Sequence, residues 1–232
     1  MSKINIEIKS EKRAYDGYLK IEEGFLSEIQ NGEVISEYSR FAVNRPNAAA
    51  VLVYNSDEDK VVLVKQHRYP VHVQGGLNSH ILEIPAGKID GGEDPKEAAI
   101  REVKEEIGYD IKEDKIFLMS EFFPSPGYSS EVIYLYAATV KNEDKTSNGG
   151  GVEGEHENIE IIHTPAHEFF KMITSGEIID GKTIVGANAF WHLRNDNLVE
   201  LGRQYLEILR LEESRKINDT TINEDDTDET SK

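Results

Sequence analysis

Residues 87 to 109 read GKIDGGEDPKEAAIREVKEEIGY, and this stretch decides the fold because it contains a clearly delimited helix with acidic residues on one side. Asp94 is a favoured N-cap residue, and Pro95 fits the first helical turn. Gly108 is a natural residue to follow the last turn. The pattern therefore predicts a helix that begins after Asp94 and ends before Gly108.

The charge pattern of this helix is unfavourable unless a cation binds to it. Glu102 and Glu106 are four residues apart, and Glu105 lies three after Glu102, so the three carboxylates gather along one side. Like charges at this spacing repel, and anions near a helix C-terminus oppose the helix dipole. Arg101 can pair with Glu105, and a hard divalent cation would turn the remaining repulsion into binding. The alternative is an acidic solvated helix, common in a chain with 44 acidic and 26 basic residues.

The whole segment resembles the Nudix box, a signature made of a glycine turn, a single glutamate and an R-E-x-x-E-E helix. Its fixed positions are matched by Gly87, Glu93, Arg101, Glu102, Glu105, Glu106 and Gly108. Tyr109 departs from the family pattern, which usually has an aliphatic residue, but a bulky apolar ring can fill the same place. We interpret Glu93 and Arg101 as structural, with a buried arginine that ties the loop to the helix. The resemblance extends over residues 46 to 200 and implies an α/β/α sandwich with a mixed sheet.

The composition excludes several classes of protein. A chain of 232 residues can bury one sizeable core and a small second module. It has no cysteine, which excludes disulfides and thiolate zinc sites and suits a reducing cytoplasm, where we expect the protein to be. The N-terminal residues lack the pattern of a targeting signal, and no apolar run reaches transmembrane length, so we expect no membrane partner. A formal net charge of −18 argues against nucleic acid as a partner.

The chain is expected to contain three parts. Short strand-like stretches around the turn signal Asn31-Gly32 predict a small antiparallel β module at residues 1–45. Strands interrupted by the box helix and followed by further helices predict an α/β or α+β domain, the Nudix hydrolase domain, at residues 46–212. Residues 213–232 are polar and acidic, which predicts a disordered tail. The family resemblance implies that the N-terminal module serves a homodimer in which one subunit completes the substrate site of the other.

The family resemblance also implies that the box glutamates hold magnesium, or manganese, beside a diphosphate that water attacks. Glu102 and Glu106 are the first-choice metal ligands, and Glu105 is a further ligand and a catalytic candidate. The turn before the helix can add the backbone carbonyl of Ala86. Metal ions placed in this way lower the pKa of water and neutralise charge on the phosphoryl oxygens.

A second acidic cluster follows three consecutive glycines from Gly149, in the stretch NGGGVEGEHENIEII. A flexible glycine hinge before carboxylates suits a loop that closes over substrate, and an acidic surface hairpin is an equally good interpretation. The stretch resembles the loop of ADP-ribose and nucleotide-sugar pyrophosphatases that carries a late catalytic glutamate. This resemblance makes Glu157 a further metal ligand and Glu155 the base that activates water, with Glu153 as the fallback.

Substrate phosphates are expected to meet arginine. Arg68, just past a buried strand, is the first choice and Arg45 the second, because arginine suits bidentate phosphate contacts. Either could instead be a surface ion-pair partner. Glu83, in the strand that leads into the box, is also assigned to the substrate site. Three histidines lie near Arg68 in the sequence, and we interpret them as structural or surface residues rather than zinc ligands: His67, His72 and His80.

Two loops bear on the choice of substrate. In residues 122–131, Pro126-Gly127 predicts a rigid turn, and Ser129 can bind sugar hydroxyls or phosphate unless the segment is only a connecting loop. This loop resembles the S-P-G motif of ADP-ribose pyrophosphatases, and GEIIDGKT at residues 176–183 resembles the same branch. GGGVE together with GEIIDGKT also resembles the GDP-mannose-cleaving branch. These likenesses imply a magnesium-dependent nucleoside diphosphate sugar pyrophosphatase, with ADP-ribose, giving AMP and ribose 5-phosphate, ahead of GDP-mannose.

Two other functions fit the same family. A Nudix-fold sensor would bind a nucleotide sugar without cutting it, but such proteins usually lose box carboxylates, and this chain keeps them all. A general nucleoside triphosphate hydrolase would not need the N-terminal module or the acidic loop. Hydrolysis of a nucleoside diphosphate sugar therefore remains the leading hypothesis.

Overall fold

The computed structural model describes residues 3–75, 79–152, 154 and 158–195. Contacts divide the chain into two units, Met1–Ala187 and Asn188–Lys232, and the site discussed below lies in the first. The boundaries after residues 45 and 212 that the sequence suggests stay predictions. No helix within the described residues is long and apolar enough to cross a membrane.

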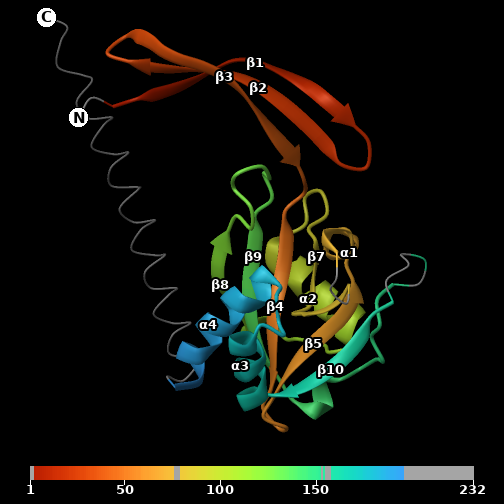
Figure 1. Cartoon of the computed structure of the whole chain (residues 1–232). Helices are drawn as coiled ribbons and strands as arrows, with labels where there is room; N and C mark the ends of the chain where they lie inside the picture. Colours follow the sequence, from red (N-terminus) through yellow and green to blue (C-terminus); the bar gives the residue numbers. More distant parts are fainter. Residues whose placement is uncertain (1–2, 76–78, 153, 155–157, 196–232) are drawn as a thin grey trace, which may run out of the picture. The chain divides into compact units, whose positions relative to one another are not determined.

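The first three strands form an antiparallel sheet of their own, in the order β1-β2-β3 (Figure 1). They are β1 (Asn5–Asp16), β2 (Lys20–Gln30) and β3 (Glu33–Asn44). The turn between β2 and β3 places Asn31 at a φ of 53° and Gly32 at 84°, the pair of left-handed conformations that a two-residue Asn-Gly hairpin turn needs. The predicted small antiparallel sheet is therefore confirmed.

The second sheet carries seven of the described strands. They are β4 (Ala48–Asn55), β5 (Lys60–His67), β6 (His80–Glu83), β7 (Ala86–Lys88), β8 (Ile116–Phe122), β9 (Ile133–Val140) and β10 (Glu160–Pro165). Five follow the order β10-β5-β4-β9-β8, while β6 pairs with β5 and β7 pairs with β4. β4 and β9 run parallel, and the other pairs are antiparallel. The sheet is mixed, as the sequence predicts.

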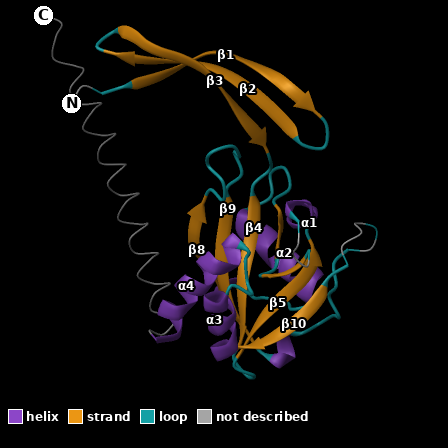
Figure 2. Cartoon of the chain, in the orientation of Figure 1, coloured by secondary structure: helices purple, strands orange, loops and turns teal. Residues whose placement is uncertain are grey.

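Helices cover both faces of this sheet (Figure 2). They are α1 (Tyr69–Gln74), α2 (Pro95–Ile107), α3 (Ala166–Ser175) and α4 (Gly181–Asn195), with short 3₁₀ turns at Glu113–Lys115 and Asn142–Asp144. Side chains alternate along β4: Val51 and Val53 join the buried cluster that contains α2, and Leu52 turns to the other face, next to Gly186 of α4. The predicted α/β/α sandwich is therefore present.

Candidate active site

Helix α2 begins and ends where the sequence predicts. The side chain of Asp94 accepts hydrogen bonds from the backbone N–H groups of Lys96, at 2.8 Å, and Glu97, at 3.4 Å. Gly108 follows the last turn with a left-handed φ of 76°. These caps fix both ends of the helix and thereby the direction in which its carboxylates point.

The carboxylates of α2 face the outer edge of β7. Glu106 is 2% exposed, and its Oε2 accepts a hydrogen bond from the backbone N–H of Ala86 at 3.0 Å. The carboxylate of Glu102 lies against Gly87, where an added Cβ would come within 2.0 Å of it. Glycine is therefore needed at this position for the strand and the carboxylate to approach each other.

The register of β7 also directs the carbonyl of Ala86 toward α2. The Pro85 carbonyl and the Ile89 N–H make 2.9 Å hydrogen bonds to the β4 side of the ladder. Because such bonds alternate along an antiparallel pair, the backbone groups of Ala86 and Lys88 point to the opposite edge. The Lys88 carbonyl accepts a hydrogen bond from Arg101 Nη2 at 3.1 Å on that edge. The Ala86 carbonyl therefore has the direction that a metal ligand would need.

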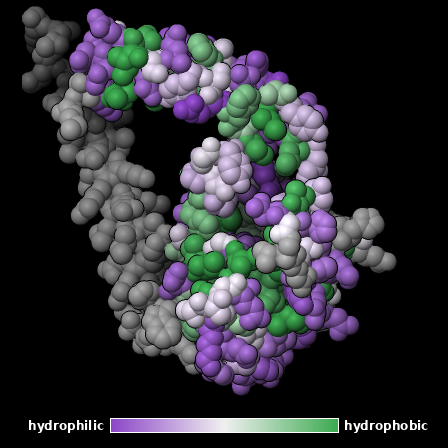
Figure 3. Space-filling view, viewed as in Figure 1, coloured by the Kyte–Doolittle hydropathy of each residue, from purple (hydrophilic) through white to green (hydrophobic). Residues whose placement is uncertain are grey.

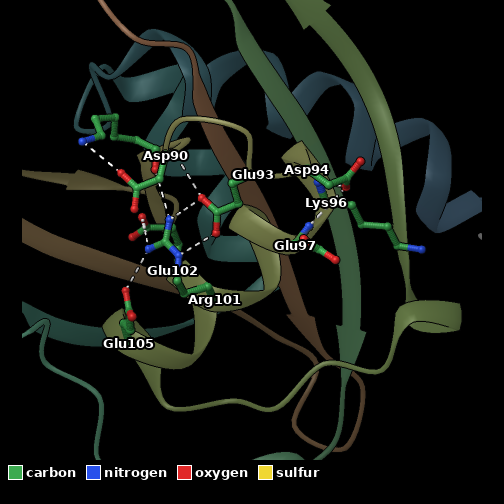
Figure 4. A network of polar contacts seen from close by, with 9 residues as sticks. Asp90, Glu93, Asp94, Lys96, Glu97, Arg101, Glu102 and Glu105 are labelled. Atoms are coloured by element: carbon green, nitrogen blue, oxygen red, sulfur yellow. Dashed lines mark hydrogen bonds and ion pairs between the residues drawn. The ribbon is translucent and has the colours of Figure 1, made fainter.

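Arg101 lies among the acidic side chains of α2 (Figure 4). Its Nε and Nη2 donate to Glu93 at 2.9 and 3.1 Å, and its Nη1 donates to Glu102 at 2.8 Å and to Glu105 at 3.0 Å. The pair with Glu105 that the spacing suggests is thus present. Arg101 ties the loop to the helix as expected, although its side chain is 32% exposed and not buried.

The donor atoms on this side of α2 suit a hard divalent cation. Glu102, Glu105, Glu106 and the Ala86 carbonyl offer oxygen only, which Mg²⁺ and Mn²⁺ prefer. Within the described residues no three acidic or histidine side chains already converge as a metal site. Arg101 Nη1 instead bridges Glu102 and Glu105. Metal binding would therefore exchange contacts with Arg101 for contacts with the metal.

Arg68 is held by the buried carboxylate of Glu83. Its Nε and Nη2 donate to the two carboxylate oxygens at 2.6 and 2.8 Å, and Lys182 donates to the same carboxylate. Burial alone would raise the pKa of Glu83, but Arg68 and Lys182 together lower it below its usual value. Burial alone would lower the pKa of Arg68. The negative charges of Glu83 and, to a smaller extent, Glu106 outweigh this effect and raise it. Arg68 and Glu83, both assigned to the substrate site, are in direct contact.

Lys182 and Asp180 belong to this cluster, and neither is predicted from the sequence to be a site residue. Lys182 Nζ lies 3.1 Å from Asp180 Oδ2, which also accepts hydrogen bonds from the hydroxyl and the N–H of Thr183. The Thr183 hydroxyl in turn accepts the Ile84 N–H at 2.9 Å. These bonds fasten the start of α4 to the strand that leads into the box. Lys182 is the only basic residue of the stretch GEIIDGKT, and this single positive charge could have identified it as a candidate for binding phosphate.

The loop of residues 122–131 forms the turn that Pro126-Gly127 predicts. The Ser129 N–H donates to the Ser125 carbonyl at 2.9 Å. The Ser129 hydroxyl accepts a hydrogen bond from the Glu131 N–H at 3.2 Å. Ser129 therefore stabilises its own turn, and its assignment to substrate stays a prediction.

The same loop is bonded to the end of β3. The Val43 N–H donates to the Tyr128 carbonyl at 2.6 Å, and the Ser130 N–H donates to the Val43 carbonyl at 3.1 Å. Arg45 Nη2 lies 3.7 Å from Glu131 Oε1, so Arg45 has the ion-pair role that is the alternative to phosphate binding. The loop joins the end of β3 to the second sheet.

The glycine run before the second acidic cluster is anchored on α2. Gly149, Gly150 and Gly151 all have positive φ angles, and the last two donate backbone hydrogen bonds to carbonyls near the end of α2. Two of the three glycines are thus bonded to the helix, and a hinge function of the run stays a prediction. The predicted catalytic and metal residues that follow lie outside the described residues: Glu153, Glu155 and Glu157.

Three histidines gather at the ends of β5 and β6. The ring of His67 lies 5.8 Å from that of His72 and 5.6 Å from that of His80, measured between centroids. They are not among the groups that could hold a metal ion in the part of the chain that the structure describes. All three are exposed, which agrees with their interpretation as surface residues, and the expectation that they do not bind zinc stays a prediction.

Comparison with known proteins assigns the family. The sequence profile of the NUDIX domain matches residues 44–182, more than half of the chain. The chain belongs to the Nudix family. Its box is therefore the glutamate-rich segment of α2 and β7 described above, and the protein is a Nudix hydrolase.

Two pyrophosphatases and one solved structure are similar to this Nudix hydrolase. The GDP-mannose pyrophosphatase of Salmonella typhimurium is 38% identical over 172 residues, which cover 74% of this chain and 85% of that protein. The GDP-mannose pyrophosphatase of Yersinia pestis is 39% identical over 147 residues, covering 63% and 71%. The crystal structure of an ADP compounds hydrolase matches with a TM-score of 0.64 at 20% identity, covering 83% of this chain and 96% of that one. The structural match supports the fold alone.

The contact between Gly87 and Glu102 in the Nudix box gives a first prediction. In Gly87→Ala the new Cβ would displace the flexible Glu102 carboxylate, so we expect the fold to persist and activity at limiting Mg²⁺ to fall about 10-fold or more. Gly91→Ala is the matched control, because a Cβ there meets open space. Hydrolysis over a Mg²⁺ series, with thermal melts, checks both variants. An equal loss of activity at limiting Mg²⁺ in Gly87→Ala and Gly91→Ala would contradict the prediction.

The Nudix-box pair of Glu93 and Arg101 gives a second prediction, for acid stability. Arg101, with a further hydrogen bond from the Asp90 N–H, lowers the pKa of Glu93 from 4.5 to about 2. A carboxylate with a lowered pKa stabilises the fold above its unfolded-state pKa and loses that effect as the pH falls toward its folded-state pKa. Glu93→Gln should therefore be less stable by about 1 to 2 kcal/mol at pH 7, and the difference should shrink between pH 4.5 and 2. Urea unfolding at several pH values measures it, and a pH-independent difference would contradict the assignment.

Proposed function

We propose that this Nudix hydrolase cleaves the pyrophosphate bond of a nucleoside diphosphate sugar, with GDP-mannose as the leading substrate. The observation that carries the proposal is the row of oxygen donors along α2 and β7, with the cations Arg68 and Lys182 held close by on one buried carboxylate. The GDP-mannose pyrophosphatases that match most of this chain support GDP-mannose. ADP-ribose, ranked first from the S-P-G motif, becomes the second candidate.

The cofactor we propose is Mg²⁺, with Mn²⁺ as a substitute. Glu102, Glu105, Glu106 and the Ala86 carbonyl would hold it, and Glu157 is a further ligand by family resemblance. When bound, the metal neutralises charge on the phosphoryl oxygens and lowers the pKa of water. The oxygen-only donor set and the backbone contacts of Glu102 and Glu106 support this assignment.

The groups of the chain itself have distinct roles in the proposed reaction. Water attacks one phosphorus, the bond from that phosphorus to the bridging oxygen breaks, and GDP-mannose yields GMP and mannose 1-phosphate. The proton of the water passes to a carboxylate, for which Glu155 is the candidate and Glu105 or Glu153 the alternatives. Arg68 and Lys182 supply the positive charge that a diphosphate needs in a chain of net charge −18.

The surface of the β1–β3 sheet supports a homodimer. Apolar side chains on these strands are exposed, including Ile6 at 53%, Ile8 at 57% and Phe41 at 55%, and Figure 3 shows apolar residues at this surface. A three-stranded sheet with uncovered apolar residues is poorly stabilised alone. A second copy of the chain would cover them, in keeping with the module at residues 1–45.

We place the enzyme in the cytoplasm, where a chain without cysteine is at no disadvantage.

The dimer leads to a testable expectation. Full-length protein should have the mass of a dimer by light scattering, because isolated monomers would expose the apolar side chains of β1–β3. Ile6→Glu/Ile8→Glu should shift the mass toward the monomer, while Asn5→Glu, on the opposite face of β1, should not. A monomer mass for active full-length enzyme would contradict the arrangement.

A product assay tests the substrate. With Mg²⁺ present we expect kcat/KM for GDP-mannose or ADP-ribose to exceed that for ATP or dGTP by at least about 10²-fold, because a triphosphate leaves the sugar-binding groups without partners. Chromatography identifies the products: GMP from GDP-mannose supports the leading candidate, and AMP from ADP-ribose alone supports the second. Glu106→Gln, which keeps the size of the side chain, should lose roughly 10²-fold or more in kcat. Efficient release of pyrophosphate from triphosphates, with both sugar substrates untouched, would overturn the proposal.

A further inference from the structure

The segment of residues 145–151 covers the C-terminal end of α2, where helix carbonyls have no partner within the helix. The Gly150 N–H donates to the Glu106 carbonyl at 2.8 Å, and the Gly151 N–H donates to the Glu105 carbonyl at 3.1 Å. Two proposed metal ligands therefore have their backbone carbonyls bound by the same glycine run.

The residues before the glycines complete this cap. Lys145 Nζ donates to the Ile107 carbonyl at 3.1 Å. The N–H groups of Thr146 and Ser147 donate to the Gly108 carbonyl at 2.8 and 3.2 Å. The ammonium of Lys145 places positive charge at the negative end of the helix dipole.

The approach of the two backbones is close enough to require glycine at one position of the run. A Cβ at Gly149, where φ is 65°, would lie 2.6 Å from the Glu106 carbonyl oxygen and 2.8 Å from the backbone of Ile107. A Cβ at Gly150, where φ is 105°, would meet nothing within 4 Å. Both positions have strained backbones for other residues, but only Gly149 is pressed against the helix.

We propose that the segment of residues 145–151 is a positioning element that sets the metal affinity of the Nudix box. It fixes the backbone of Glu105 and Glu106, while Ala86 fixes the Glu106 carboxylate from the other side. Glu106 is thus held through its carbonyl and through its side chain, and small shifts of the last turn are transmitted to the donor atoms. This inference rests on the metal-dependent function proposed above.

Binding of Mn²⁺ to the full-length protein, followed by the electron paramagnetic resonance of the free ion, tests the inference without relying on turnover. Gly149→Ala should push the end of α2 away and weaken Mn²⁺ binding by about 10-fold or more, the range seen when groups supporting metal ligands are removed. Gly176→Ala, at a left-handed φ of 76° outside this segment and with nothing within 4 Å of the added Cβ, is the matched control and should bind within a few-fold of wild type. Phe169→Leu, on the buried face of α3, controls for a general loss of stability.

The possible outcomes separate this inference from the function on which it rests. Wild-type protein that binds no Mn²⁺ would overturn both. Wild-type binding with equal affinity in folded Gly149→Ala, or equal losses in Gly149→Ala and Gly176→Ala, would overturn the positioning role alone. If Gly149→Ala does not fold, Lys145→Met carries the test: several-fold weaker Mn²⁺ binding supports the inference, and unchanged binding overturns it.

Discussion

The direct contact between the backbone of β7 and the carboxylates of α2 is the constraint on which the rest of the site depends. Glu106 accepts the Ala86 N–H, and Glu102 lies where a side chain at Gly87 would otherwise stand. A carboxylate that is 2% exposed is stable in its charged form only with good partners. The backbone N–H of Ala86 in β7 is one such partner. The close approach therefore requires a residue without a side chain at Gly87 of β7, and the site requires carboxylates on α2.

Electrostatic balance is the second requirement, because two groups of acidic side chains in the described part of the site are paired with cations. Arg101 bridges Glu93, Glu102 and Glu105 within the box. The buried Glu83 binds both Arg68 and Lys182. Removing one partner from such a buried cluster leaves an uncompensated charge, which costs more than the pair contributes. The cluster around Glu83 therefore fixes its cations in place, and two positive groups in fixed positions are what a diphosphate needs in so acidic a chain.

Much of this could be predicted from the sequence, because the decisive signals are local. Asp94 and Gly108 delimit α2 through interactions within a few residues, and Asn31-Gly32 specifies its hairpin turn by φ alone. The contacts of Glu83 with Arg68 and Lys182 could not be predicted, since these partners lie 15 and 99 residues away and the contacts depend on how β5, β6 and α4 meet. The sequence also does not indicate whether Arg45 contacts a phosphate or Glu131.

The glycine run shows why residue type alone does not determine a structural role. Glycine is used both where a chain must move and where two backbones must touch, and both uses appear as the same letters. At Gly149 the deciding fact is the 2.6 Å between its missing Cβ and the Glu106 carbonyl, a distance that exists only after α2 and the loop have come together. Positive φ angles and hydrogen bonds to helix carbonyls mark this run as a cap.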